Sequence, residues 1–219
     1  MTAKAPDAEP PLVTPFVGAV VAVTLAYLVA AVVGALQSGN REFILYIAVM
    51  AALIAYIGWL HWRFHLAEWS LAALSLWGLL HMAGGLVPVP ESWPIDGHIR
   101  VLYSWWIIPS RLKYDQAVHA FGFGVATWVC WQIAQASIAR WLGVARRDVR
   151  PSAPLLTICA LAGMGLGAAN EVVEFAATLA VAETNVGGYV NTGWDLVSNA
   201  LGSITAALAI AICARRARD

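Results

Sequence analysis

The stretch from Ala153 to Ala182 reads APLLTICALAGMGLGAANEVVEFAATLAVA. A helix needs about 20 mainly apolar residues to cross the hydrocarbon core of a bilayer, and this stretch exceeds that length with only two charged residues, Glu171 and Glu174. It therefore predicts a transmembrane helix with two carboxylates inside the membrane. A charged side chain in such a place is costly unless it is paired, so the two glutamates suggest a functional site.

Five further stretches have similar length and apolar character. They run from Phe16 to Leu36, Phe43 to Trp62, Leu66 to Val87, Tyr114 to Trp141, and Gly193 to Ala214. The chain has 219 residues, of which 60% are hydrophobic and 12% charged, and its mean hydropathy is +0.70. This composition is too apolar for a soluble globular protein of this length. We expect an all-α polytopic membrane protein with six transmembrane helices in one bundle, over residues 16–214.

The basic residues between the spans predict an orientation. With the N-terminus inside, nine Lys and Arg residues fall on the inner side and four on the outer side. The positive-inside rule then places both termini in the cytoplasm. Residues 1–15 are polar and rich in proline, which predicts a disordered cytoplasmic tail, and residues 215–219 predict a basic one. The long connection 88–113 then lies outside, and its Ile99–Ile108 part predicts an interfacial helix or re-entrant piece that forms a lid.

The composition also excludes some classes of function. The chain has no basic domain, so nucleic acid is not an expected partner. Its three cysteines lie singly in apolar runs without C-x-x-C spacing, which indicates neither a disulfide framework nor a thiolate metal site. The expected partners are membrane lipids and a lipid-linked small-molecule substrate. The sequence carries no signal for an oligomeric state.

The strongly polar residues of the predicted spans fall at one depth. With alternating helix directions and a rise of about 1.5 Å per residue, each lies within roughly 15 Å of the outer end of its helix. Three pairs are spaced i to i+3 or i+4, so both members of each pair share a helix face. Glycines beside the pairs, such as Gly163 and Gly202, allow close helix approach. We expect one polar centre in the outer half, formed by His81, Asp115, His119, Glu171, Glu174, Asp195 and Asn199.

Histidine and carboxylate side chains from several helices supply the nitrogen and oxygen ligands that a divalent cation such as zinc prefers. The candidate metal ligands are His81, Asp115, His119 and Asp195. The candidate catalytic residues are Glu171, Glu174 and Asn199. A glutamate outside the metal shell would act as general acid or base. This interpretation predicts a metal-assisted hydrolase or transferase acting on a lipid or lipid-linked envelope molecule.

Two other functions fit the same residues. The acids could carry protons or a cation across the membrane in a transporter. The cluster could also be a hydrogen-bond network without a catalytic role, because each interhelical bond stabilises a bundle by about 0.6 to 2 kcal/mol. The inner parts of the last three spans offer no ionisable residue that would continue a conduction path, which favours an enzyme over a transporter.

Four ordered motifs carry a resemblance to a known family. They are LHMAG at 80–84, KYDQAVHAFG at 113–122, NEVVEF at 170–175 and GWDL at 193–196. Together they resemble the YjdF-like family of bacterial membrane proteins over roughly residues 66–207. His119, Glu171 and the run DLVSNALG at 195–202 are also similar to the VanZ-like family, which is named for a glycopeptide-resistance accessory protein. The resemblance implies a helical protein of the bacterial inner membrane, with an envelope-related role on the VanZ-like side.

The chain departs from the YjdF-like pattern just before its last span. YjdF-like proteins tend to have further acids in this turn, where this chain has Gly188 and Asn191. A metal that required those additional carboxylates would bind this chain more weakly. The resemblance implies no particular reaction.

Overall fold

A computed structural model describes residues 11–39, 41–181 and 184–216. Over this part of the chain, six helices are long and apolar enough to cross a membrane. They are α1 (Pro15–Ser38), α2 (Arg41–Phe64), α3 (Glu68–Leu86), α4 (Tyr114–Leu142), α5 (Ala153–Ala180) and α6 (Tyr189–Arg216). The predicted all-α bundle of six spans is confirmed. Residues 1–10 and 217–219 of the predicted tails lie outside the described residues.

Local sequence explains where the first helix begins, whereas the last helix begins earlier than predicted. α1 starts at Pro15, whose missing N–H is not needed in a first turn, and the hydroxyl of Thr14 accepts a backbone N–H of that turn at 3.2 Å. α6 begins at Tyr189, earlier than the predicted start at Gly193. Asn191 is therefore part of the helix.

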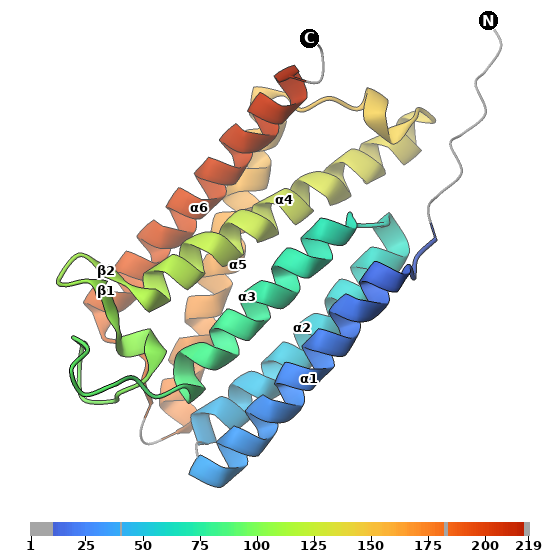
Figure 1. Cartoon of the computed structure of the whole chain (residues 1–219). Helices are drawn as coiled ribbons and strands as arrows, with labels where there is room; N and C mark the ends of the chain where they lie inside the picture. Colours follow the sequence, from blue (N-terminus) through green and yellow to red (C-terminus); the bar gives the residue numbers. More distant parts are fainter. Residues whose placement is uncertain (1–10, 40, 182–183, 217–219) are drawn as a thin grey trace, which may run out of the picture.

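Helix α4 is the central helix of the bundle (Figure 1). It packs most extensively against α6 and also contacts α5 and α3, while α1 packs mainly on α3. The close approach of α4 and α6 depends on small residues. A Cβ at Gly202 would collide with the carbonyl oxygen of Ala120, and one at Gly124 would lie 3.2 Å from the carbonyl oxygen of Gly202. This packing sets the polar residues of α6 directly beside those of α4.

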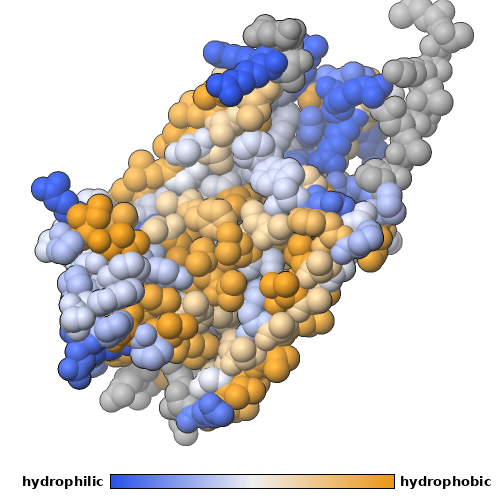
Figure 2. Space-filling model, in the orientation of Figure 1, coloured by the Kyte–Doolittle hydropathy of each residue, from blue (hydrophilic) through white to orange (hydrophobic). Residues whose placement is uncertain are grey.

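On the face that Figure 2 shows, hydrophobic side chains predominate along the middle of the bundle, and strongly hydrophilic side chains gather toward its two ends. Large hydrophobic side chains are exposed on α1, α2, α3, α5 and α6, for example Val29, Tyr56, Leu76, Phe175 and Leu208. An apolar belt of this size between polar ends suits a protein that is surrounded by lipid.

Of the two predictions for Ile99–Ile108, the interfacial helix is wrong, and the re-entrant piece stays a prediction. The connection between α3 and α4 contains a single turn of 3-10 helix, Leu102–Ser104, and a small antiparallel sheet of β1 (Trp106–Ile108) and β2 (Leu112–Lys113). The 3-10 turn packs on both α3 and α4. The connection therefore covers the ends of these two helices, although it contains no α-helix.

The sequence of β1 and of the turn after it explains why a helix does not form. Ile107 and Ile108 are β-branched and favour extended backbone. Pro109 follows them, and Ser110 adopts a left-handed conformation with φ of 57°, which turns the chain back on itself. The last three residues of the apolar run therefore form one strand of a hairpin instead of part of an interfacial helix.

The connection between α4 and α5 is anchored at the other end of the bundle by Arg146. Its guanidinium donates to the backbone carbonyl oxygens of Phe64, His65 and Gln132 at 2.9 to 3.0 Å. Burial lowers the pKa of this guanidinium, but arginine ordinarily titrates so far above neutral pH that the group stays charged. Arg146 thus ties the connection to the turn between α2 and α3.

Candidate metal centre

The helix directions bring the predicted polar residues to one end of the bundle. α3 and α5 end there, and α4 and α6 begin there, so we call it the loop end (Figure 1). The predicted residues on these helices are His81, Asp115, His119, Glu171, Glu174, Asp195 and Asn199. All of them except His81 surround the ring of His119.

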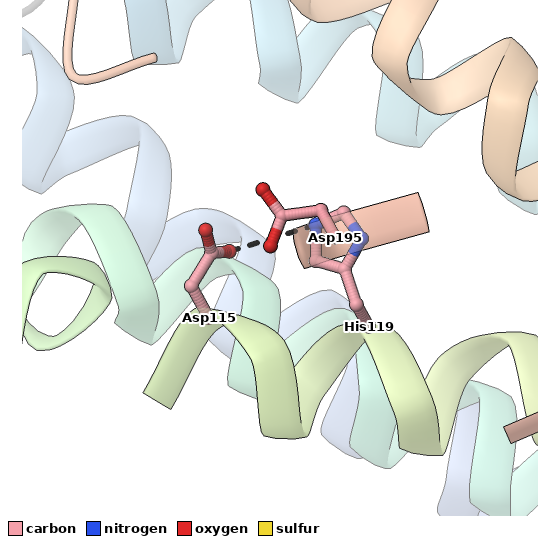
Figure 3. A group of neighbouring side chains, drawn as sticks. All are labelled: Asp115, His119 and Asp195. Carbon is pink, nitrogen blue, oxygen red and sulfur yellow. Dashed lines mark ion pairs between the residues drawn. The ribbon is translucent and has the colours of Figure 1, made fainter. Parts of the chain in front are cut away.

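The ring of His119 is buried, and its two nitrogens face different partners. Nδ1 lies 3.0 Å from Oδ1 of Asn199, a hydrogen bond that crosses from α4 to α6. Because an amide oxygen only accepts, this bond places the imidazole proton on Nδ1. Nε2 then keeps its lone pair, and it lies 3.5 Å from Oδ1 of Asp115 (Figure 3). A lone pair and a carboxylate oxygen this close favour a proton or a cation between them.

Two glutamates of α5 lie near the two nitrogens of the same ring. Oε1 of Glu171 lies 3.6 Å from Nδ1 of His119, and Oε1 of Glu174 lies 3.9 Å from Nε2. Both separations exceed hydrogen-bonding distance. Glu174 accepts a hydrogen bond of 2.8 Å from the Asn170 amide, whereas both carboxylate oxygens of Glu171 are buried without a hydrogen-bond partner.

Asp195 on α6 is fully buried. Its Oδ2 accepts a hydrogen bond of 2.6 Å from the side-chain amide of Asn191, one turn earlier on the same helix. Its Oδ1 is buried without a hydrogen-bond partner. Figure 3 shows this carboxylate beside Asp115 and His119 of α4.

A glycine of α5 makes room for the amide that holds the histidine. A Cβ at Gly167 would lie 2.5 Å from Nδ2 of Asn199, so a larger residue would displace that side chain. Asn199 is 1% exposed and contacts α4 and α5 at once. The glycines that were predicted to allow close helix approach thus act at the cluster itself.

Four carboxylates therefore surround one imidazole: those of Asp115, Glu171, Glu174 and Asp195. Such an excess of acids in an apolar setting requires protons or a bound cation. Two triplets have ligand atoms within 4.8 Å of one another, Asp115 with His119 and Asp195, and His119 with Glu171 and Glu174. Ligands about 2.1 Å from a common ion lie about 3 to 4 Å apart, so either triplet can hold a divalent cation after small side-chain adjustments.

His81 lies apart from this cluster. Its Nδ1 lies 2.5 Å from the hydroxyl of Tyr103, which belongs to the connection between α3 and α4. Burial raises the pKa of the Tyr103 hydroxyl well above its ordinary value, so the hydroxyl keeps its proton and donates it to Nδ1. The connection is thereby fastened to α3, and the role of His81 as a metal ligand stays a prediction.

A cavity of about 280 Å³ opens at the loop end. Asp115 and Glu174 are among its lining residues, so it reaches the cluster. Tyr46, His81 and Tyr103 stand around it, and the two connections at this end, residues 96–104 and 184–188, supply most of the remaining wall. The cluster is therefore accessible between the two connections.

The family described as "Predicted membrane protein (DUF2238)" matches residues 19–216 of the chain. The chain belongs to this family. DUF2238 is the YjdF-like family, so the resemblance carried by the four ordered motifs is confirmed. The resemblance to the VanZ-like family stays a prediction. No curated protein and no solved structure matches the chain.

This DUF2238 protein has polar residues at the site that its sequence did not reveal. Lys113, buried just before α4, donates to Oδ1 of Asn191 and lies 3.4 Å from Oδ2 of Asp96. Asn191 in turn holds Asp195, so polar contacts lead from the connection to the cluster. Asn191 and Asp195 have helical i, i+4 spacing, but the predicted start of the span at Gly193 left Asn191 outside.

Glu42 is a second residue that sequence reasoning missed. It stands in the first turn of α2, is 5% exposed, and lines the cavity. Its Oε2 accepts the backbone N–H of Asn185 at 2.9 Å, which fixes the connection between α5 and α6. The sequence did contain one signal for this residue, namely a single carboxylate beside the start of an apolar span.

Proposed function

We propose that the cluster around His119 is a divalent-metal centre, for zinc or a similar ion, and that it supports hydrolysis or group transfer. One observation carries this proposal: both oxygens of Glu171 and Oδ1 of Asp195 are buried acceptors without a hydrogen-bond partner. Such acceptors are costly, and a cation among them removes the cost. A purely structural hydrogen-bond network would instead pair its acceptors.

The favoured ligands are Nε2 of His119 and the carboxylates of Asp115 and Asp195. Asn199 orients the ring, since its bond to Nδ1–H directs the other nitrogen toward the ion. Three protein ligands leave a position for water, as in catalytic zinc sites. An ion held there would supply a Lewis acid and an activated water molecule.

The proposed acid and base residues are Glu171 and Glu174. They stand on one face of α5 and approach the His119 ring with their carboxylates. Glu174 also lines the cavity, where it can reach a substrate or a water molecule. Glu171 has no competing hydrogen bond, so both of its oxygens remain available for proton transfer.

The proposed substrate is a lipid or lipid-linked envelope molecule. The cluster is enclosed by membrane-spanning helices, and its cavity lies at the loop end, where lipid headgroups meet the acyl chains. Under the predicted orientation in the bacterial inner membrane, with both termini cytoplasmic, this end faces outward. The substrate would then enter from the outer leaflet.

The packing beyond the cluster supports a reaction site more than a conduction path. Gly202 meets the backbone of α4 one residue after His119, so the two helices close on each other there. Farther along, Thr127 and Ser203 are fully buried against Gly163. A permeating ion would have to pass this packed region without an ionisable relay, which is costly.

The direct test is the metal content of the protein after purification without chelators, measured by inductively coupled plasma mass spectrometry. We expect about one divalent ion per chain in the wild type and its loss in His119→Ala. His61→Ala is the matched control, because His61 bonds the backbone of Leu12 at the opposite end of the bundle and should keep the ion. Equal metal content in His119→Ala and the wild type would refute the proposed centre.

A further inference from the structure

A second cavity of about 280 Å³ lies at the end of the bundle opposite the loop end. Its walls come from three parts of the chain: Trp128 and Trp131 on α4, Arg147 and Arg150 on the connection to α5, and residues of α6 that include Ile210 and Cys213. The cavity is remote from the metal centre, and the proposed function does not use it.

The lining combines two kinds of chemistry. Arg147 and Arg150 contribute guanidinium groups, and both side chains are exposed. Most of the other lining residues are aromatic or aliphatic, and none of the lining residues, all of which the structure describes, carries a carboxylate. The cavity therefore suits a ligand that is anionic in one part and apolar in another.

The two parts are arranged in depth. Arg147 and Arg150 follow the end of α4, in the connection between two spans, whereas Trp128 and Trp131 lie within the α4 span. Gln135 stands between them, about 6 Å along the helix from Trp131. Charge at the membrane boundary, followed by aromatic and aliphatic surface, matches the order of headgroup and acyl chain in a lipid.

Neighbouring arginines have different tasks in this connection. Arg146 is engaged by three backbone carbonyls and fixes the path of the chain. That anchoring holds Arg147 and Arg150 at the cavity, since all three belong to one short segment. The cavity thus has a rigid frame.

We propose that this cavity binds one anionic phospholipid of the adjoining leaflet. The guanidinium groups of Arg147 and Arg150 pair with the phosphate oxygens, and an acyl chain lies along Trp128 and Ile210. Arginine suits this role because its planar group bonds two phosphate oxygens at once. Basic pockets between transmembrane helices bind anionic headgroups by the same chemistry.

The test uses the full-length protein in detergent, stripped of lipid and titrated with phosphatidylglycerol or phosphatidylcholine, with bound lipid counted by native mass spectrometry. We expect one molecule of phosphatidylglycerol to bind in preference to phosphatidylcholine. Arg147→Ala/Arg150→Ala should weaken that binding roughly 10- to 30-fold, because each arginine near an anionic headgroup contributes on the order of a few-fold in affinity. Both side chains are exposed, so the double variant should fold normally, which its melting temperature checks.

The matched control is Arg215→Ala/Arg216→Ala, which removes the same charge from the end of α6 without touching the lining of the cavity. It should bind phosphatidylglycerol like the wild type. Equal loss in both double variants would show diffuse attraction and overturn the proposed site, as would equal binding of the two lipids. Displacement of the lipid by inorganic phosphate at similar affinity would also overturn it, because a soluble anion would then be the occupant.

Discussion

Only one of the two ring nitrogens of His119 makes a hydrogen bond. Its Nδ1 bonds with Asn199, while its Nε2 faces the acids Asp115 and Glu174 without a hydrogen bond. Glu171 approaches the ring and has no hydrogen-bond partner at either oxygen. An amide in place of one acid keeps the shape of the side chain and removes its charge. Such a substitution therefore distinguishes the hypothesis of a cation site from the hypothesis of a structural hydrogen-bond network.

The substitution Glu171→Gln should have opposite effects on stability and on metal binding. In EDTA we expect the variant to melt at the same temperature as the wild type or higher. The reason is that a buried acid without a hydrogen-bond partner lowers the free energy of unfolding by about 1 to 3 kcal/mol. Zinc affinity should fall at least about tenfold, a loss of roughly 1.4 kcal/mol, because the amide removes a negative charge beside the proposed ion although Glu171 is not one of the favoured ligands. Thermal denaturation and titration calorimetry in detergent measure the two quantities.

Asp148→Asn is the control for this substitution, because Asp148 is exposed at the opposite end of the bundle. It should change neither the melting temperature nor the zinc affinity. If the melting temperature measured in EDTA falls in Glu171→Gln but not in Asp148→Asn, the result would favour the structural network.

Helices α4 and α6 carry the site together, because their close contact places Asp195 and Asn199 beside His119. The spacing of the polar pairs was enough to predict this part of the site. Residues three or four apart share a helix face whatever the tertiary structure, and alternating span directions fix their depth.

The Gly202→Ala substitution should force the two helices apart, since the new Cβ would meet the carbonyl oxygen of Ala120. We expect a loss of about 1 to 3 kcal/mol in the free energy of unfolding, together with weaker metal binding. Gly165→Ala is the matched control, because nothing lies within 4 Å of its Cβ position. It should be neutral or slightly stabilising. Melting temperatures of both variants in one detergent decide the outcome, and equal values would contradict the packing role of Gly202.

The connections could not be predicted as well as the helices. The path of residues 87–113 depends on contacts with distant residues, such as the bond between Tyr103 and His81, and no local period encodes them. Lys113 was missed for the same reason, because its partners are distant in sequence: Asp96 lies 17 residues before it, and Asn191 lies on α6. The prediction for His81 rests on its depth in the span, and its hydrogen bond with Tyr103 could not be predicted from that depth.

Exposed hydrophobic side chains on five of the six long helices lie between two ends of the bundle, and each end has its own cavity. The basic residues are distributed unequally between these ends. Within the described part of the chain, seven Lys and Arg residues belong to the side opposite the loop end and four to the loop end, and the seven include Arg140, Arg146, Arg147 and Arg150. This asymmetry favours an outward-facing loop end.

Labelling of single cysteines tests this orientation. In a variant whose three native cysteines are replaced, Gly188→Cys at the loop end should react with a membrane-impermeant thiol reagent in intact cells. Gly188 is exposed and has nothing within 4 Å of its Cβ position, so the thiol should be accessible. Asp148→Cys, exposed at the opposite end, should react only after lysis. The reverse pattern would invert the orientation and place the proposed substrate entry on the cytoplasmic side.

The hydrogen bond from Asn191 to Asp195 has a consequence for which ion the centre selects. Because one lone pair of Oδ2 already accepts the amide N–H, Oδ1 is the oxygen that Asp195 offers most readily to the proposed ion, which favours monodentate coordination. Calcium binds about six to eight oxygen atoms and commonly binds both oxygens of one carboxylate. Zinc binds about four ligands at shorter distances. A single amide in the first turn of α6 would thus discriminate against the larger ion by limiting denticity.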